Sequence, residues 1–357
     1  MIVELKDVCE KEISNIRQKD LLDKKGDYPI YGASGLIGNV DFYRQETPYV
    51  AVVKDGAGIG RAMLLPAKSS VIGTMQYLIP KGNVLPEYLY YVVKNMHLEK
   101  YYSGATIPHI YFKYYKKEKF NLVDLDQQRK IISVFKKIED AIRKQRDELT
   151  NLDTLIKARF VEMFGDLKFD TPVSKYIESL TAGKSLAGKE KCTNKVLNTG
   201  AVSYDKFKND YKYLPSNYVP DENNKVRTGN VLISRMNTQE LVGATAYVWE
   251  APENTYLPDR LWRANLKENV NSIFLWQVLI HPLLKLQIQR VSSGTSGSMK
   301  NISKSNFLKL KVPDVNEESQ NKFASFVQQV DKSKVAIQKS LDETQTLFDS
   351  LMQKYFS

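Results

Sequence analysis

At 357 residues the chain is too long for one ordinary domain and suits two or three, each with its own core. Its hydrophobic content of 42% is typical of globular proteins, and the sequence has no run of about eighteen apolar residues that could span a bilayer. The net charge of +11 favours a polyanionic partner. The first residues, MIVELKD, carry acids where a signal peptide needs basic and apolar residues, so we expect a cytoplasmic protein.

Cysteine and histidine are sparse and scattered. Cys9 and Cys192 have no CxxC partner, and the three histidines, His97, His109 and His281, show no metal-ligand spacing. We therefore expect no disulfide, no metal site and no cofactor.

The first third of the chain, residues 1–126, has the pattern of a mixed α+β domain. Residues 49–53 predict a short buried strand, 86–92 an amphipathic helix and 119–123 another strand-like segment. A Ser-Gly turn at 103–104 separates the helix from the last strand.

A glycine-rich stretch, GAGIG at 56–60, follows the strand at 49–53. A glycine turn that binds a dinucleotide or a methyl donor opens a helix and has an acid about twenty residues later. Here residues 61–66 read as another strand, and no acid lies between Asp55 and Glu87. We favour a structural β-turn, with a cofactor site as the alternative.

Residues 127–166 predict one long helix. Apolar residues recur there at alternating steps of three and four, as in a coiled coil, with Gln145 and Arg159 as polar interruptions. The expected seam consists of Phe135, Ile138, Ile142, Leu149, Leu152 and Ile156.

Residues 167–312 predict a second mixed α+β domain. Its elements are a strand at 231–233, a helix at 271–278, a Ser-Gly turn at 293–294 and a strand at 308–312. This segment carries a net charge of +9, against +2 for 1–126, +2 for 127–166 and −2 for 313–357. Its cations are interleaved with tyrosines, which favours a folded nucleic-acid-binding surface over a disordered tail.

The final segment, residues 313–357, predicts a second long helix that repeats the first. Residues 131–165 and 323–357 align without a gap at a constant offset of 192. The matching seam consists of Val330, Ile337, Leu341, Phe348 and Leu351, with Lys334 and Thr344 as polar interruptions. Each helix exposes an apolar stripe that it cannot bury alone, so we expect the two to pair. We favour an antiparallel coiled coil, because a duplicated unit of domain plus helix then closes with pseudo-two-fold symmetry.

In its order of elements the chain resembles the specificity (S) subunits of type I restriction-modification enzymes, over essentially its whole length. The matching pieces are DGAGIGR at 55–61, SGATIPHI at 103–110 and LDQQRKI at 125–131. The last departs from the family's usual Pro-Pro-Leu-x-Glu-Gln at the start of the helix, and so does VPDVNEE at 312–318.

The resemblance implies two target-recognition domains, 1–126 and 167–312, and two long spacer helices, 127–166 and 313–357. Each domain would read one half of a bipartite double-stranded DNA target. The helices would set the spacer and recruit methyltransferase (M) subunits, which act with restriction/translocase (R) subunits.

The resemblance also implies a subunit that is not itself an enzyme. The sequence has no Asn/Asp-Pro-Pro-aromatic motif for adenine methylation. TAGKS at 181–185 lacks the earlier glycine of a phosphate-binding loop, since Glu178 occupies that place.

Candidate DNA contacts are cations and an amide that can address base edges, together with small donor-rich residues of the Ser-Gly turns. They are Lys54, Arg61, Ser103, Thr106, Arg235, Asn237, Arg260, Arg263, Ser293, Thr295 and Lys300. For each cation the alternatives are a phosphate contact or a solvated surface charge, and His109 fits a packed or capping role better than base reading.

Tyr111, Tyr114 and Tyr115, interleaved with lysines, could form a basic aromatic surface, although we expect at least one to pack in the core.

Two other functions stay open at this point. A catalytic DNA methyltransferase would need a cofactor pocket and a catalytic motif. A coiled-coil adaptor without DNA specificity would account for the heptads but not for the +9 domain.

Overall fold

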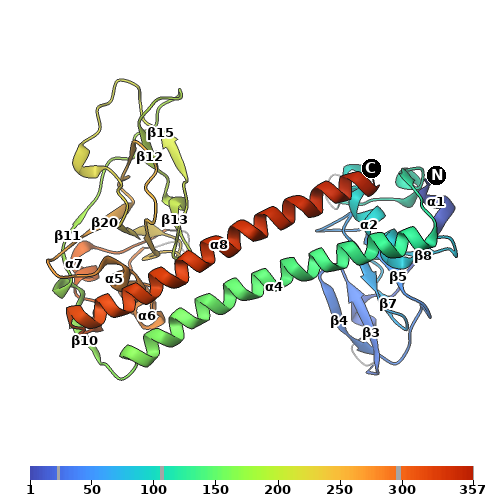
Figure 1. The fold of residues 1–357 in the computed structure, drawn as a ribbon, viewed down its shortest axis with the longest axis horizontal. Helices are drawn as coiled ribbons and strands as arrows, with labels where there is room; N and C mark the ends of the chain where they lie inside the picture. Colours follow the sequence, from blue (N-terminus) through green and yellow to red (C-terminus); the bar gives the residue numbers. More distant parts are fainter. Residues whose placement is uncertain (22–24, 105–107, 295–298, 357) are drawn as a thin grey trace. The chain divides into compact units, whose positions relative to one another are not determined.

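The computed structural model describes residues 1–21, 25–104, 108–294 and 299–356. The chain divides into two compact units, one of Met1–Leu149 with the C-terminal residues from Ile337, the other of Thr150–Ala336. Each unit is a mixed α/β domain joined to parts of two long helices (Figure 1).

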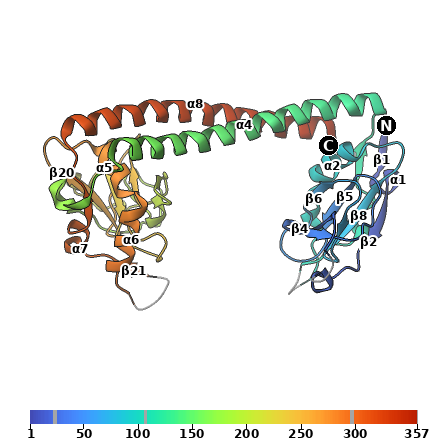
Figure 2. The same cartoon turned by 90° about the horizontal axis from the view of Figure 1, so that it is seen from below.

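The first unit is built on two small sheets. The four-stranded antiparallel sheet has the order β2 (Cys9–Ile13), β8 (Met75–Pro80), β5 (Tyr49–Val53), β6 (Ala62–Leu65). Helix α2 (Pro86–Asn95) packs on β5 and β6 (Figure 2). Since strand residues alternate between faces, Val50 and Val52 join the core beneath α2, whereas Tyr49 and Ala51 belong to a cluster on the other face.

The other sheet of this unit has the order β4 (Gly35–Val40), β3 (Tyr28–Gly32), β7 (Ser70–Val71). The remaining elements are β1 (Ile2–Glu4), which pairs with β9 (Lys119–Asn121), and the short helices α1 (Leu5–Val8) and α3 (Phe112–Tyr115).

The second unit repeats this topology. Its four-stranded sheet has the order β11 (Ile177–Thr181), β20 (Leu261–Leu266), β16 (Val231–Ser234), β18 (Thr245–Tyr247). Its three-stranded sheet has the order β15 (Tyr211–Tyr213), β12 (Lys195–Leu197), β19 (Thr255–Tyr256). As in the first unit, the three-stranded sheet contains one antiparallel and one parallel pair, and α5 (Ser272–Leu279) contacts β16 and β18.

Other elements of the second unit are the helices α6 (Pro282–Val291) and α7 (Lys304–Leu308) and three strand pairs. The pairs are β10 (Phe169–Pro172) with β22 (Lys311–Pro313), β13 (Val202–Ser203) with β14 (Lys206–Phe207), and β17 (Met236–Asn237) with β21 (Lys300–Asn301). The strand expected over 308–312 is wrong at its start, because Leu308 ends α7 and pairing with β10 begins at Lys311.

Two helices of 40 residues, α4 (Leu125–Phe164) and α8 (Glu317–Phe356), begin in the same way. The side chains of Asp124 and Asn316 accept hydrogen bonds from backbone N–H groups three residues later, at 2.8 and 2.9 Å. Such capping satisfies amides that have no partner in the first turn. Helix α8 starts four residues after the expected boundary at 313, because Pro313 still belongs to β22.

A buried glutamine lies four residues after each cap, and the two glutamines are again 192 residues apart. The Gln128 side chain accepts from Leu85 N at 2.8 Å, and that of Gln320 accepts from Asn271 N at 3.1 Å. Leu85 and Asn271 are the residues that precede α2 and α5. In each unit this amide therefore fixes the long helix to the helix on the sheet.

In the first unit α4 and α8 pair antiparallel. Phe135 lies 5.3 Å from Phe348, ring centre to ring centre, and Gln145 donates to the Ser340 hydroxyl at 2.8 Å. Residues farther along α4 thus contact residues earlier in α8. Of the expected seam residues in this unit, Phe135, Ile142, Leu341 and Phe348 are buried in one core, and Ile138, Leu149 and Leu351 pack against it half-buried.

The second unit shows the same direction of pairing. Asp153 forms an ion pair with Lys334 at 2.5 Å, and Phe160 lies 5.6 Å from Phe323. Of the expected seam residues, Ile156 and Val330 are buried in the core of this unit, and Leu152 packs against it. Ile337 is half-buried and joins none of the described clusters.

In the part of the chain that the structure describes, no helix combines the length and apolar character needed to cross a membrane.

Candidate nucleic-acid interface

A two-residue backbone bridge closes a loop in the first unit. Ser103 and His109 exchange N–H···O bonds at 2.9 and 2.8 Å, and Ile110 N donates to Lys54 O at 2.9 Å. Gly56 N donates to Pro108 O, also at 2.9 Å. The candidate contacts Lys54 and Ser103, far apart in sequence, are thereby brought to the same end of the central strand β5.

The second unit contains the same bridge. Ser293 and Asn301 exchange N–H···O bonds, both at 2.9 Å, and Ile302 N donates to Arg235 O at 3.1 Å. Asn237 pairs with Lys300 between β17 and β21. Arg235, Asn237, Ser293 and Lys300 are therefore gathered at the end of β16, as Lys54 and Ser103 are at the end of β5. Thr106 and Thr295 lie outside the described residues.

Lys54 is paired with Asp55, which also contacts His109. Its ammonium lies 2.5 Å from the Asp55 carboxylate, whose other oxygen lies 2.7 Å from His109 Nδ1. All three side chains are partly exposed. Asp55 thus neutralises the cation locally and joins the loop after β5 to the Ser103–His109 bridge.

The glycine-rich stretch after β5 is a turn between strands. Gly56, Gly58 and Gly60 all have φ between +82° and +84°, a conformation that glycine adopts without strain. A Cβ at Gly60 would lie 2.5 Å from the Glu99 backbone nitrogen. The chain continues directly into β6, which confirms the strand predicted at 61–66. Arg61 is exposed and donates to Ala33 O at 3.1 Å.

Arg235 occupies the place of Lys54 but has a different environment. Its guanidinium lies 5.7 Å from the ring centre of Trp262, and no described carboxylate forms an ion pair with it. Arg235 Nε, Trp262 Nε1 and the Asn301 amide oxygen are buried without a hydrogen-bond partner among the described residues. Arginine placed on an aromatic face can still offer its terminal guanidinium nitrogens to an acceptor.

The other cations and the amide of the second unit differ in their availability. The Asn237 amide nitrogen donates to the Ser234 hydroxyl at 3.2 Å, and Arg260 is exposed. Arg263 donates to the Asn265 side chain at 3.1 Å, and burial together with neighbouring Arg227 lowers its pKa. Arg263 is therefore tied into the sheet, whereas Arg260 is open to a ligand.

The two Ser-Gly loops also differ. Ser103 is half-buried and its hydroxyl donates to His109 O at 3.2 Å, whereas Ser293 is exposed. Lys300 donates to Gly294 O at 3.0 Å, so its ammonium is drawn back over its own loop.

The tyrosine cluster of the first unit is divided between surface and core. Tyr115 is fully buried, as expected for at least one of the three, and burial raises its pKa. Tyr111 and Tyr114 are half exposed, and the Lys113 ammonium lies 5.5 and 4.8 Å from their ring centres. Tyr111, Phe112 and Lys113 line a pocket of about 250 Å³ together with Lys11 and Lys116.

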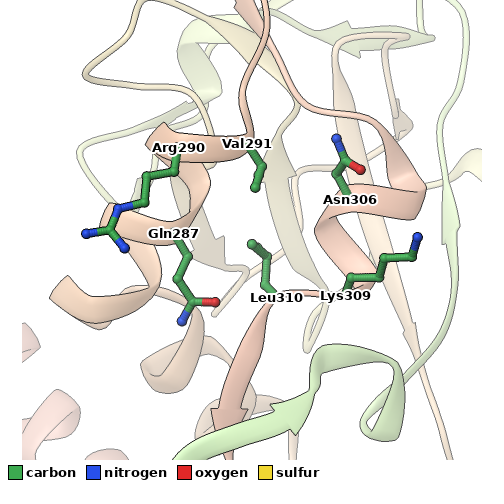
Figure 3. A pocket seen from close by; sticks show the side chains of 6 residues that line it. All are labelled: Gln287, Arg290, Val291, Asn306, Lys309 and Leu310. Atoms are coloured by element: carbon green, nitrogen blue, oxygen red, sulfur yellow. The ribbon is translucent and has the colours of Figure 1, made fainter.

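A second pocket, also of about 250 Å³, lies between α6 and α7 (Figure 3). Arg290 and Lys309 stand on opposite sides of it, with Val291 and Leu310 between them. Gln287, which also lines it, is engaged with the backbone of Lys311. Cations and amides around such a hollow suit an anionic group such as a phosphate.

Three residues that the sequence did not single out belong to these sites: Asp55 as a contact of Lys54, Trp262 beneath Arg235, and Asn301 in the second bridge. A signal for Asn301 was present, since it follows the second Ser-Gly turn as His109 follows the first.

Comparisons with known proteins point to one family. The family described as type I restriction modification DNA specificity domain matches residues 1–151 and 180–344. The chain is similar to the type I restriction enzyme MjaVIII specificity subunit of Methanocaldococcus jannaschii, with 22% identity over 309 residues, 79% of this chain and 72% of that protein.

Two solved structures share the fold. The type I restriction-modification S subunit from M. genitalium has a TM-score of 0.67 at 14% identity, covering 100% of this chain and 96% of that one. A chain from a structural study of complex assembly and conformational transition of the type I R-M system has a TM-score of 0.55 at 15% identity, covering 100% and 97%.

Proposed function

Because the chain belongs to the family of type I restriction-modification DNA specificity domains, we propose that each of its units reads one half of a split double-stranded DNA target. The family is one of specificity domains, which favours this function over a catalytic methyltransferase and over an adaptor without DNA specificity.

The observation that carries the proposal is a backbone arrangement, here called the frame, that both units share but that holds different side chains in each. Both units place a cation directly after the central strand and tie it, through one backbone bond, to a Ser-Gly loop. In the first unit the cation is Lys54 and in the second it is Arg235. Arginine can make a bidentate contact with guanine O6 and N7, whereas lysine offers a point charge. The same frame can therefore present two different base preferences.

The further elements of the proposal concern boundaries and partners. We assign DNA reading to 1–126 and 167–312, and spacing to the helices within 127–166 and 313–357. A helix of 40 residues rises about 60 Å, comparable to about 18 base pairs, so helix length would set the unread spacer. Methyltransferase subunits would bind the helices and act with restriction/translocase subunits, in the cytoplasm, while this chain supplies no catalysis.

Selection from a random duplex library tests the proposal. The chain, co-purified with its methyltransferase subunits, is expected to enrich a bipartite sequence with an unread gap of fixed length. The chain alone is expected to transfer no methyl group from S-adenosylmethionine. Enrichment of no sequence, or methyl transfer by the isolated chain, would contradict the proposal.

A further inference from the structure

The turn between β13 and β14 in the second unit has an unusual composition. Its two central residues, Tyr204 and Asp205, have φ of 51° and 60°. Two-residue hairpin turns with both residues in this left-handed region are normally made by Asn-Gly, Asp-Gly or Gly-Gly, because a Cβ crowds the backbone there. A tyrosine at the first position is sterically unfavourable, yet its side chain is 71% exposed and makes no core contact that would compensate.

The turn is fixed by Asp205. Its carboxylate accepts from Thr245 N at 3.0 Å and forms an ion pair with Lys285 of α6 at 2.6 Å. Lys285 also donates to Gly243 O at 3.1 Å. The tip of the hairpin is thus held at one position by a strand, a helix and a loop, and the Tyr204 ring projects from a rigid base.

These anchors connect the tip to the candidate reading residues of the same unit. Gly243 N donates to Ser234 O at 2.7 Å, and Ser234 directly precedes Arg235. Thr245, the other anchor, pairs with Ile233 in the sheet. The hairpin tip is therefore fixed to the backbone that pairs with the end of β16, where Arg235 and Asn237 lie.

The surroundings of Tyr204 are cationic. Lys206, on β14, and Lys208, just after this strand, are both exposed. The whole segment 167–312 carries a net charge of +9. An exposed ring beside lysines suits a polyanion with apolar groups at its base edges, which is the chemistry of duplex DNA: the lysines address phosphates and the ring packs on base edges in a groove.

We propose that Tyr204 is a specificity-determining residue, whose ring packs against one base step of the half-site read by the second unit. The inference rests on the proposed function. Here the turn sequence lowers local stability in order to present an aromatic contact, which is the pattern expected of strain kept at a functional site.

The test uses variants that separate stability from binding. Tyr204→Asn places a residue that tolerates the left-handed region at this position, so its Tm should equal or exceed that of the wild type. Tyr204→Phe keeps the ring. Val219→Asn is the matched control, since Val219 is 87% exposed in the same unit.

Each variant is assembled with the methyltransferase subunits and titrated with duplexes that carry the sequence selected by the wild-type complex and its single-base-pair substitutions. Tyr204→Asn should bind about five- to a hundredfold more weakly and lose discrimination at one base step of one half-site. Tyr204→Phe and Val219→Asn should bind within about twofold of the wild type.

Binding of Tyr204→Asn with wild-type affinity and discrimination would overturn the inference while leaving the proposed function intact. Weakened association with the methyltransferase subunits and unchanged DNA affinity of the assembled complex would overturn it too, by assigning the ring to a protein partner. A wild-type complex without sequence preference would instead refute the proposed function.

Discussion

The two units have the same strand order and the same backbone bridge but different side chains at the end of the central strand. In the first, Lys54 is paired with Asp55, which also contacts His109. In the second, Arg235 lies over Trp262 without a described carboxylate partner. The shared backbone thus determines the position of the side chain that would contact DNA. The identity of that side chain and of its neighbours determines which ligand groups it can bind.

The comparison of the two units indicates that the fold and the contacts with a ligand depend on different residues. The bonds that form each bridge join backbone groups, so they do not depend on which side chain faces outward at these positions. Duplication of such a frame allows the two copies to diverge in base preference while the fold is retained.

The largest expected effect concerns the helices, which both units share. Leu341 is buried in the core of the first unit, so Leu341→Asp places an unpaired charge there and should cost about 3 kcal/mol or more of stability. Leu347, 51% exposed on the same helix, provides the control as Leu347→Asp. Thermal unfolding measures both. Equal Tm values for the two variants would show that the seam does not belong to the core.

The second prediction compares the two cations. Arg235→Ala should weaken binding of the assembled complex to its target by about five- to a hundredfold, because a bidentate base contact is lost. Lys54→Ala should have a smaller effect, since Lys54 is already neutralised by Asp55. Titration at a fixed salt concentration compares them, and a larger effect of Lys54→Ala would reverse the assignment.

The third prediction sharpens the role of Asp55. Asp55→Asn frees the Lys54 ammonium, so affinity for random duplex should rise several-fold. The slope of log affinity against log salt should steepen by about one unit. Lys54→Ala combined with Asp55→Asn should abolish the gain. A gain that persists in the double variant would show that Asp55 acts by general repulsion of DNA.

The smallest expected effect is a pH dependence of the stability of the second unit. His281 lies between the rings of Phe160 and Phe169, at 5.2 and 5.1 Å, and its Nδ1 accepts from Leu283 N at the start of α6. Burial lowers its pKa. The stability that this neutral histidine contributes is therefore complete above the unfolded-state pKa of about 6.5 and is lost as the pH falls through the lower folded-state pKa.

Acidification from neutral pH should thus lower the Tm by an amount on the order of a few degrees. His281→Asn keeps an N-cap residue and should flatten this dependence. His97→Asn, on the surface of the first unit, is the control and should leave the dependence as it is in the wild type. An unchanged pH profile of His281→Asn would assign the acid sensitivity to other groups.

Sequence patterns predicted the long helices well, because heptad periodicity depends on residues close together in the chain. The offset of 192 also predicted the duplication, although the buried pair Gln128 and Gln320 became evident only from their contacts. Strand order and the bridges at Ser103 and Ser293 depend on partners far away in sequence, and no local pattern specifies them.

The candidate sites show the same limit. Lys54 and Arg235 were selected as cations that can address base edges, which depends on the residue type alone. Their different partners, Asp55 and Trp262, follow from side-chain placement in the folded unit. The Tyr204–Asp205 turn gave no hairpin signal, because its residues are unfavourable in the conformation that they adopt.

Exchange of residues 167–312 for the equivalent segment of a relative with a different target, followed by genome-wide mapping of methylated adenines, tests the central claim most directly. If each unit reads its own half-site, one half of the methylated sequence should change, while the other half and the length of the spacer stay the same. A simultaneous change in both halves would show that the two units do not read DNA independently and would contradict the account.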